Sequence, residues 1–283
     1  MTFTQKIQTV LIPKAIGTYL NATSYINKKH SGNKALQIFG QPRKGVIRPY
    51  EYEYLNTYTK HTLYHNSIPI QTYSKGNGAI KILLLHGWES NAARWRNLAE
   101  LLVQTNNYTV ILADAPAHGA SGSLQFDSIL YAHFIQQVVQ HYKPNIAIGH
   151  SIGAGSIVYY LSQLQAYTFT KLILMGSPNT FTEIMQAYIN IIGLKRNAIA
   201  ALEVAILRKY NMPSTQYNIS EYIKNVTIPT YIIHDNTDVI SPVANAYAIA
   251  SNCPNATLKV TTGYGHGLKH QVINELILEY INN

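Results

Sequence analysis

The sequence is poor in cysteine and has no long hydrophobic run. Its single cysteine, Cys253, cannot form an intrachain disulfide and offers no thiolate cluster for zinc, so the chain suits a reducing compartment. No apolar stretch approaches the roughly 20 residues that a membrane-spanning helix needs. The mildly apolar segment from Thr9 to Leu20 is interrupted by Pro13 and Lys14, unlike the apolar region of a signal peptide. These absences predict a soluble, cytoplasmic protein.

Charged residues are also scarce, at 12% of 283 residues, whereas hydrophobic residues make up 47%. This composition supports a sizeable folded core and excludes a disordered chain. The formal net charge of +9 would suit nucleic acid or a membrane surface. The basic residues, however, occur as pairs, namely Lys28-Lys29, Arg43-Lys44 and Lys195-Arg196, and form no stripe interleaved with aromatic side chains. We therefore expect no nucleic-acid partner, and the sequence carries no signal for an oligomeric state.

Residues 1–34 are predicted to form a helical N-terminal extension. Apolar side chains recur there at helical spacing, at Phe3, Ile7, Val10 and Leu11. Two interpretations are open. The helix packs against the rest of the protein, which we favour, or the lysines bring residues 1–30 to an anionic membrane surface as a peripheral contact.

The pattern that follows predicts a sheet. Segments rich in β-forming residues lie at 35–39, 61–64 and 68–73. Continuous apolar runs, typical of strands buried on both faces, then appear at 81–85, 109–113, 145–148, 171–175 and 230–233. Helical periodicity separates these runs, which indicates an α/β fold with a mostly parallel central sheet flanked by helices.

We assign this core domain to residues 35–178 and 227–283. Residues 179–226 contain no obvious strand pattern and are predicted to form two or three helices. An all-helical segment of this length, inserted between two strands, favours a lid. The domain organisation expected is thus an N-terminal extension, a core domain and a helical lid or cap insertion.

A serine framed by glycines follows the run at 145–148. The segment Gly149-His150-Ser151-Ile152-Gly153 precedes a helical pattern, so it lies between a strand and a helix. A Gly-x-Ser-x-Gly pattern in that context places a nucleophilic serine on a tight turn, where the two flanking positions must lack side chains. At the start of the helix, the N–H of Ile152 would face developing negative charge. Ser151 is the candidate nucleophile, although the pattern alone also fits a glycine-rich turn.

A serine hydroxyl needs a base and an orienting carboxylate to act as a nucleophile. The segment from Ile228 to Pro242 predicts a strand, a polar turn and a helix start, and Asp235 and Asp238 come at and past the strand's carboxyl end. His266 lies in the glycine-rich loop that follows a short alternating strand at 256–260. We predict Asp238 and His266 as the partners of Ser151, with Asp235 as a rival acid.

Four local patterns, in order between residues 80 and 270, resemble the α/β-hydrolase superfamily of serine hydrolases, of the esterase or lipase type. His86-Gly87-Trp88 resembles the oxyanion loop of that family, and Asp114 to Ser121 resembles its Asp-x-Pro-Gly-His-Gly-x-Ser loop. The order of Ser151, Asp238 and His266 is also the order in that family. By position, the resemblance implies that the N–H groups of Trp88 and Ile152 bind the oxyanion.

The sequence departs from the family pattern at several positions. Ala117 replaces the usual glycine of the second loop, Ala154 stands where a second glycine often follows the serine turn, and Asp235 occupies the place of glycine in a His-Gly-x-x-Asp turn. The last departure leaves open whether Asp235 takes part in the triad.

The resemblance implies a carboxylic-ester hydrolase that acts on a small-molecule acyl substrate of small or medium size, through an acyl-enzyme on Ser151. No metal and no organic cofactor are expected. Two alternatives remain: the same triad supports thioester, amide or carbon–carbon bond cleavage in this superfamily, and the fold also suits a non-catalytic binding module. His61 and His65 have the spacing of a helical metal pair, but they fall in a strand pattern and predict no metal site.

Overall fold

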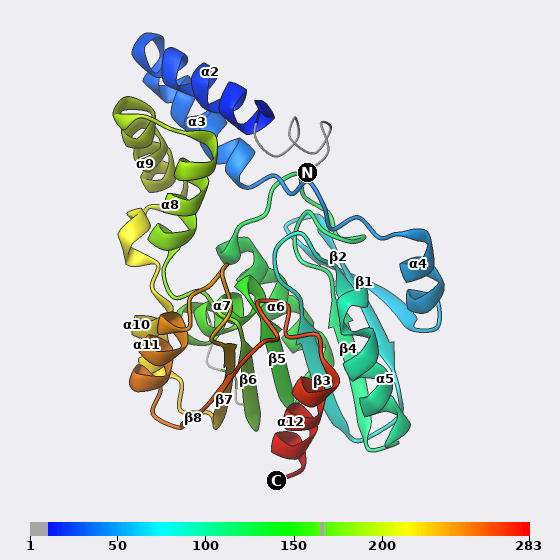
Figure 1. The fold of residues 1–283 in the computed structure, drawn as a ribbon. Coiled ribbons are helices and arrows are strands. Elements are labelled where there is room, and N and C mark those ends of the chain that lie inside the picture. Colours follow the sequence, from blue (N-terminus) through cyan, green and yellow to red (C-terminus); the bar gives the residue numbers. More distant parts are fainter. Residues whose placement is uncertain (1–10, 165–166, 168) are drawn as a thin grey trace. The chain divides into compact units, whose positions relative to one another are not determined.

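The computed structural model of the chain describes residues 11–164, 167 and 169–283. The chain divides into two compact units, each made of two stretches of sequence. The α/β unit comprises Pro42–Asn179 and Ile219–Asn283. The helical unit comprises the residues up to Gln41 and the stretch Thr180–Asn218. The α-helices and strands of both units are labelled in Figure 1.

The α/β unit is built on an eight-stranded sheet with the order β1-β2-β4-β3-β5-β6-β7-β8. The strands are β1 Thr59–His65, β2 Ile68–Lys75, β3 Ile80–Leu85, β4 Tyr108–Ala113, β5 Ile146–His150, β6 Lys171–Met175, β7 Thr230–Asp235 and β8 Ala256–Thr261. β2 runs antiparallel to both β1 and β4, and every pair from β4 to β8 is parallel. The predicted mostly parallel sheet is therefore confirmed.

Helices cover both faces of this sheet, which is why its inner strands are continuously apolar. On one face, α4 Pro49–Leu55, α5 Arg96–Gln104 and α12 Gln271–Asn282 share a core with Ile82 and Leu84 of β3. The alternate side chains Leu83 and Leu85 are fully buried on the opposite face. Helices α6 Ser128–Tyr142 and α7 Ile152–Tyr159 pack against each other on that side.

Shorter elements complete the α/β unit. They are α10 Ile219–Tyr222, α11 Ala244–Asn252, the 3-10 turns η2 Ala92–Trp95 and η5 Ile223–Asn225, and the π-helical turn η3 Tyr160–Leu164. Because β3 to β8 are parallel, their carboxyl ends lie along one edge of the sheet. The loops that leave this edge carry every residue predicted for the site.

The helical unit consists of α2 Ile12–Ile26, α3 Lys28–Phe39, α8 Phe181–Ile192, α9 Arg196–Tyr210 and the 3-10 turn η4 Ser214–Gln216. Its core joins the two stretches of sequence, since Leu20 and Ala35 pack with Tyr188 and Leu202. Two glycines let the helices touch. A Cβ on Gly17 would lie 1.7 Å from the carbonyl oxygen of Ile192, and one on Gly32 would lie 2.0 Å from that of Ala201.

The prediction of a strand at 35–39 is wrong, because these residues form the last turns of α3. A short apolar run does not distinguish a strand from a buried helix segment. Here Ser31 and Gly32 are buried inside α3. The predicted boundary at residue 34 falls within this helix, and the chain as far as Gln41 belongs to the helical unit. The apolar pattern at Phe3, Ile7 and Val10 lies outside the described residues.

The insertion expected at 179–226 contains α8, α9 and α10, with one isolated bridge between Thr180 and Asn218. Only its part Thr180–Asn218 belongs to the helical unit; the rest belongs to the α/β unit. Its role as a lid stays a prediction. Within the described part of the chain, no helix combines the length and the apolar character that crossing a membrane requires.

Candidate active site

Ser151 occupies a strained turn between β5 and α7. Its backbone has φ 54° and ψ −125°, a conformation that residues with a side chain rarely adopt and that concentrates at functional sites. The flanking glycines allow this turn: a Cβ on Gly149 would lie 2.6 Å from the Cα of Ala154, and one on Gly153 would lie 2.5 Å from the carbonyl oxygen of His86. The Ser151 N–H donates to the Met175 carbonyl of β6 at 2.7 Å, which fixes the turn to the sheet.

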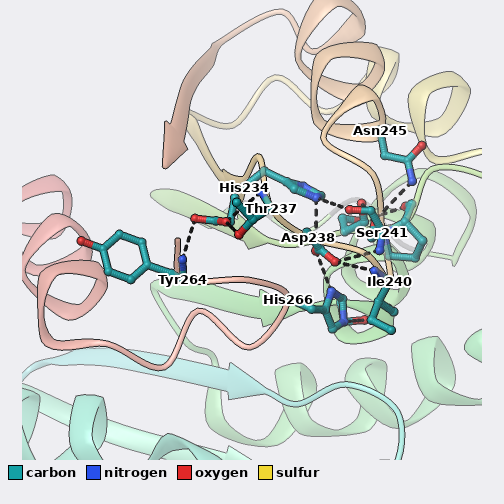
Figure 2. Close-up of polar contacts among 12 residues, drawn as sticks. His234, Thr237, Asp238, Ile240, Ser241, Asn245, Tyr264 and His266 are labelled. Carbon is teal, nitrogen blue, oxygen red and sulfur yellow. Dashed lines mark hydrogen bonds and ion pairs between the residues drawn. The ribbon is translucent and has the colours of Figure 1, made fainter. Parts of the chain in front are cut away.

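The structure brings together the three residues predicted as a triad. The Nε2 atom of His266 lies 3.0 Å from the Ser151 hydroxyl oxygen, and its Nδ1 atom lies 2.7 Å from Oδ2 of Asp238. Asp238 follows β7, and His266 lies in the loop between β8 and α12. Figure 2 shows the imidazole of His266 pointing at the carboxylate of Asp238. This chain of hydrogen bonds has the order that a serine nucleophile needs.

The Asp238 carboxylate is held as an anion in a buried setting. Its side chain is 1% exposed. Its Oδ1 atom accepts from the N–H groups of Ile240 and Ser241 at 2.8 and 2.9 Å. Burial by itself raises the pKa of Asp238, but hydrogen bonds from His234, His266 and the Ser241 N–H outweigh it and hold the pKa well below its ordinary value. Asp238 can therefore orient the imidazole and stabilise a positive charge on it.

Asp235, the rival acid, binds backbone N–H groups and threonine hydroxyls instead of an imidazole. Its two oxygens accept from the N–H of Thr237, from the hydroxyls of Thr237 and Thr261, and from the N–H groups of Gly263 and Tyr264, at 2.5 to 3.2 Å. Burial raises the pKa of Asp235, and these hydrogen bonds outweigh it and lower the pKa far more. Asp235 thus ties β7 to the loop that carries His266, without contacting the imidazole.

Two further side chains hold the same loop by its carbonyl groups. The Nε2 atom of His150 lies 2.8 Å from the His266 carbonyl oxygen, and Nη2 of Arg94 donates to the Gly267 carbonyl at 2.8 Å. Neither contact was predicted, because each joins positions more than 100 residues apart and leaves no local pattern. Together with Asp235, these side chains satisfy backbone groups in a loop whose three glycines would otherwise leave it mobile.

The predicted oxyanion donors lie beside the serine turn. Ile152 is the first residue of α7, directly after Ser151. Gly87, the residue before Trp88, approaches the turn so closely that a Cβ on it would lie 2.9 Å from the Cβ of Ser151. Among the described residues, neither the Trp88 N–H nor the Ile152 N–H donates a hydrogen bond. Their role as oxyanion donors stays a prediction.

The histidines of the two neighbouring loops are occupied by structural hydrogen bonds. The Nε2 atom of His86 accepts from the Ala115 N–H at 2.9 Å, and that of His118 accepts from the Glu89 N–H at 3.0 Å. The buried carboxylate of Asp114 accepts from Tyr73 and from the N–H groups of Ala92 and Ala120. Burial raises the pKa of Asp114 to about 6, against the effect of these hydrogen bonds. These contacts fix the loops after β3 and β4.

The described part of the chain holds no group of three or more His, Cys, Asp or Glu side chains that could bind a metal ion. His61 and His65 lie on β1, where their rings stack on His141 and His133 of α6 with centroids 4.6 and 4.8 Å apart. In each stacked pair the two imidazole rings lie face to face. The nitrogens of a pair therefore do not converge on one point.

Comparison with known proteins points to one fold. A family model described as "alpha/beta hydrolase fold" matches residues 81–192. A non-heme haloperoxidase of Rhodococcus erythropolis is 23% identical over 255 residues, covering 71% of this chain and 92% of that protein. A pimeloyl-[acyl-carrier protein] methyl ester esterase of Wigglesworthia glossinidia brevipalpis is 26% identical over 213 residues, covering 59% of this chain and 78% of that protein.

Among solved structures, an esterase from Exiguobacterium antarcticum matches with a TM-score of 0.60 and 19% identity, covering 76% of this chain and 96% of that one. At this level of identity the match concerns the fold. The matched family segment runs from β3 through the serine turn and into α8, and so contains the predicted oxyanion loop and nucleophile.

Proposed function

We propose that this chain is a member of the α/β-hydrolase superfamily and a serine hydrolase that cleaves carboxylic esters of small or medium acyl substrates. One observation carries the proposal: the imidazole of His266 bridges the Ser151 hydroxyl at 3.0 Å and the Asp238 carboxylate at 2.7 Å. The esterases among the similar proteins support an ester as the substrate.

The proposed reaction begins with proton transfer to His266. Asp238 accepts the Nδ1–H of the imidazole, so the lone pair on Nε2 faces the Ser151 hydroxyl and takes its proton as the Oγ atom attacks the acyl carbon. The negative charge that develops on the carbonyl oxygen is bound by the N–H groups of Trp88 and Ile152. Asp238 stays ionised and stabilises the imidazolium.

Two bond-breaking steps complete the turnover. The carbon–oxygen bond of the ester breaks, and His266 gives its proton to the departing alcohol, which leaves the acyl group on Ser151. A water molecule then loses a proton to His266 and attacks the acyl carbon. The acid is released, and the proton returns from His266 to the Ser151 oxygen. These steps use only the substrate, water, the three side chains and the two backbone N–H groups.

Hydrolysis of p-nitrophenyl esters of increasing acyl length tests the proposal. We expect activity in the wild type, near-complete loss in Ser151→Ala, and retained activity in Ser251→Ala, which changes an exposed serine at the end of α11. Equal activity in wild type and Ser151→Ala would refute the role of Ser151. Higher kcat/KM on thioesters, amides or a meta-cleavage-type diketone would assign the same triad to another bond.

Labelling with a fluorophosphonate probe tests whether Ser151 is an activated nucleophile. Stoichiometric labelling at Ser151 supports an activated nucleophile. Absence of labelling in folded protein, shown by an unchanged circular dichroism spectrum, would instead favour a binding module that keeps the fold without catalysis.

A further inference from the structure

The helical unit carries most of the positive charge of the protein. Its two stretches, residues 1–41 and 180–218, contain nine lysines and arginines and two glutamates, a formal charge of +7 out of the +9 of the whole chain. The α/β unit, which is much larger, is nearly neutral. Such an asymmetry indicates a surface that meets an anionic partner.

Four of these nine cations lie at one end of the helical unit. The chain enters and leaves the unit at the end where α3 finishes and α8 begins, as the ring contact of Phe39 with Phe181 at 5.6 Å shows. The α2–α3 turn and the α8–α9 turn form the other end. Asn21 of α2 contacts the α8–α9 turn, because its side chain donates to the Gly193 carbonyl at 2.9 Å and accepts from the Lys195 N–H at 2.7 Å. Gly32, just after the start of α3, lies against Ala201, just after the start of α9, so the two helices begin at the same end of the unit.

We call this end the basic tip and define it as residues 25–29 and 190–196. Its cations are exposed; they are Lys28, Lys29, Lys195 and Arg196. No carboxylate lies within either segment. Both glutamates of the unit lie elsewhere: Glu183 is in the first turn of α8, and Glu203 accepts from the hydroxyl of Ser214 at 2.8 Å. Two basic pairs that are far apart in sequence thus meet on one surface.

The cations of the basic tip occupy positions that helices disfavour. α3 begins with Lys28 and Lys29, and α9 begins with Arg196 after Lys195, with no acidic residue in the first turn of either helix. The N-terminal end of a helix carries partial positive charge, so cations there reduce helix stability. A sequence that breaks this rule twice at the same end of one unit indicates a function for those charges.

Exposed apolar side chains precede both basic pairs in the sequence of the basic tip. Ile26 is 88% exposed, Tyr25 72% and Ile191 54%. Their backbone is well fixed: the side chain of Asn27 caps α3 by accepting from the His30 N–H at 2.9 Å, and the Ser31 hydroxyl donates to the Leu20 carbonyl at 2.8 Å. The backbone of the basic tip is therefore preorganised, and docking costs little further conformational entropy.

We propose that the basic tip docks on an anionic lipid surface, with Ile26 and Tyr25 entering the headgroup region and the four cations contacting lipid phosphates. A projecting apolar pair flanked by lysines suits a deformable interface. A stable protein partner would instead need a complementary patch of about 800 Å² on each side, which two projecting side chains do not provide. Nucleic acid would leave the apolar side chains exposed.

The expected strength follows from the charges. Each lysine or arginine near an anionic membrane raises the partition coefficient roughly fivefold. Four such residues and one inserted apolar pair give reversible binding that weakens as salt rises, because the charges act within a screening length. The inference does not depend on the hydrolase activity, since no residue of the proposed triad lies in the helical unit.

Sedimentation with vesicles tests the proposal. We expect the full-length protein to bind phosphatidylcholine vesicles that contain phosphatidylserine, to bind pure phosphatidylcholine vesicles far less, and to be released by salt. The double variant Lys28→Glu, Lys29→Glu should lose at least about 25-fold in partitioning. Glutamate at these positions favours the start of α3, so the variant should remain folded.

The matched control is the double variant Lys44→Glu, Lys259→Glu, which makes the same charge change at exposed positions of the α/β unit. We expect it to bind anionic vesicles nearly as the wild type does, and we expect Ile26→Ser to bind several-fold less. The proposal is overturned if the wild type does not bind these vesicles, if both charge variants lose binding equally, or if Ile26→Ser binds as tightly as the wild type. Binding to polyglutamate in preference to vesicles would overturn it in favour of an acidic protein partner.

Discussion

The α/β unit and the helical unit are each assembled from two separate stretches of chain, but different forces join the stretches. In the α/β unit, the parallel ladder between β6 and β7 joins the first stretch to the second, residue by residue from Leu172 and Thr230 onward. In the helical unit, packed side chains and a few hydrogen bonds of Asn21 join them. A ladder fixes the positions of strand ends, and a catalytic site needs that accuracy. Packed helices fix a core and leave their surface free to vary.

The largest expected effect is a loss of ester hydrolysis that leaves vesicle binding unchanged. Ser151→Ala should lower ester hydrolysis by roughly 10⁴-fold or more, because the members of a triad act as a unit. The same variant should bind anionic vesicles like the wild type, because the basic tip lies in the other unit. Parallel assays of hydrolysis and vesicle binding check both statements. A loss of vesicle binding in Ser151→Ala would mean that the units do not act separately.

The next largest effect concerns Asp238. Asp238→Asn should lower kcat by roughly 10³-fold or more, because an amide does not hold His266 in the tautomer that accepts a proton. Its stability should also respond differently to pH. The pKa of Asp238 is lowered on folding, so ionised Asp238 stabilises the protein above the unfolded value of about 3.9, and this stabilisation is lost as the pH falls. Acid denaturation of the variant should therefore be shallower than that of the wild type.

A smaller loss of activity is expected for Asp235→Asn, of about tenfold in kcat. Its carboxylate accepts five hydrogen bonds, and an amide would turn a donor toward one of those donors. The loop that carries His266 should then move, while the tautomer of the imidazole is unchanged. Kinetics against pH should show a lower kcat with the same profile. A loss as large as that of Asp238→Asn would return Asp235 to the triad.

The smallest effect on activity is expected for Gly32→Ala in the helical unit. Its Cβ would lie 2.0 Å from the Ala201 carbonyl oxygen, so the helices must separate, which costs about 1–3 kcal/mol in the free energy of unfolding. Fluorophosphonate labelling of Ser151 should stay unchanged. Thermal unfolding measures the first effect, with Asn33→Ala as the control at an exposed position of the same helix. A slowed labelling rate would show that the helical unit supports the site.

Local chemistry made much of the α/β unit predictable. The tight turn at Ser151 was predicted from the glycines that it requires, and the buried strands were predicted from their continuous apolar runs. Asp238 was preferred over Asp235 by position, and the structure shows which hydrogen bonds each accepts. The contacts of His150 and Arg94 with the loop of His266 could not be predicted, because they form only when distant strands come together in the complete sheet.

The helical unit was predicted less well for a related physical reason. Helical periodicity shows that a segment has a buried face, but it does not show which distant segment covers that face. No sequence pattern therefore indicated that α2 and α3 pack against α8 and α9. The run from Ala35 to Phe39 was also mistaken for a strand. Gly17 and Gly32 were the available signals, since glycine inside a helix often marks a close approach.

The two-stretch construction of the helical unit has a consequence for synthesis on the ribosome. α2 and α3 leave the ribosome early, but their partners α8 and α9 follow only after the whole stretch Pro42–Asn179 has been translated. At rates of about 5–20 residues per second, the first helices wait for roughly 7–28 s with their apolar faces uncovered. During that interval chaperones can bind the exposed apolar faces of α2 and α3. Slow codons ahead of α8 would lengthen the time for which these faces are exposed.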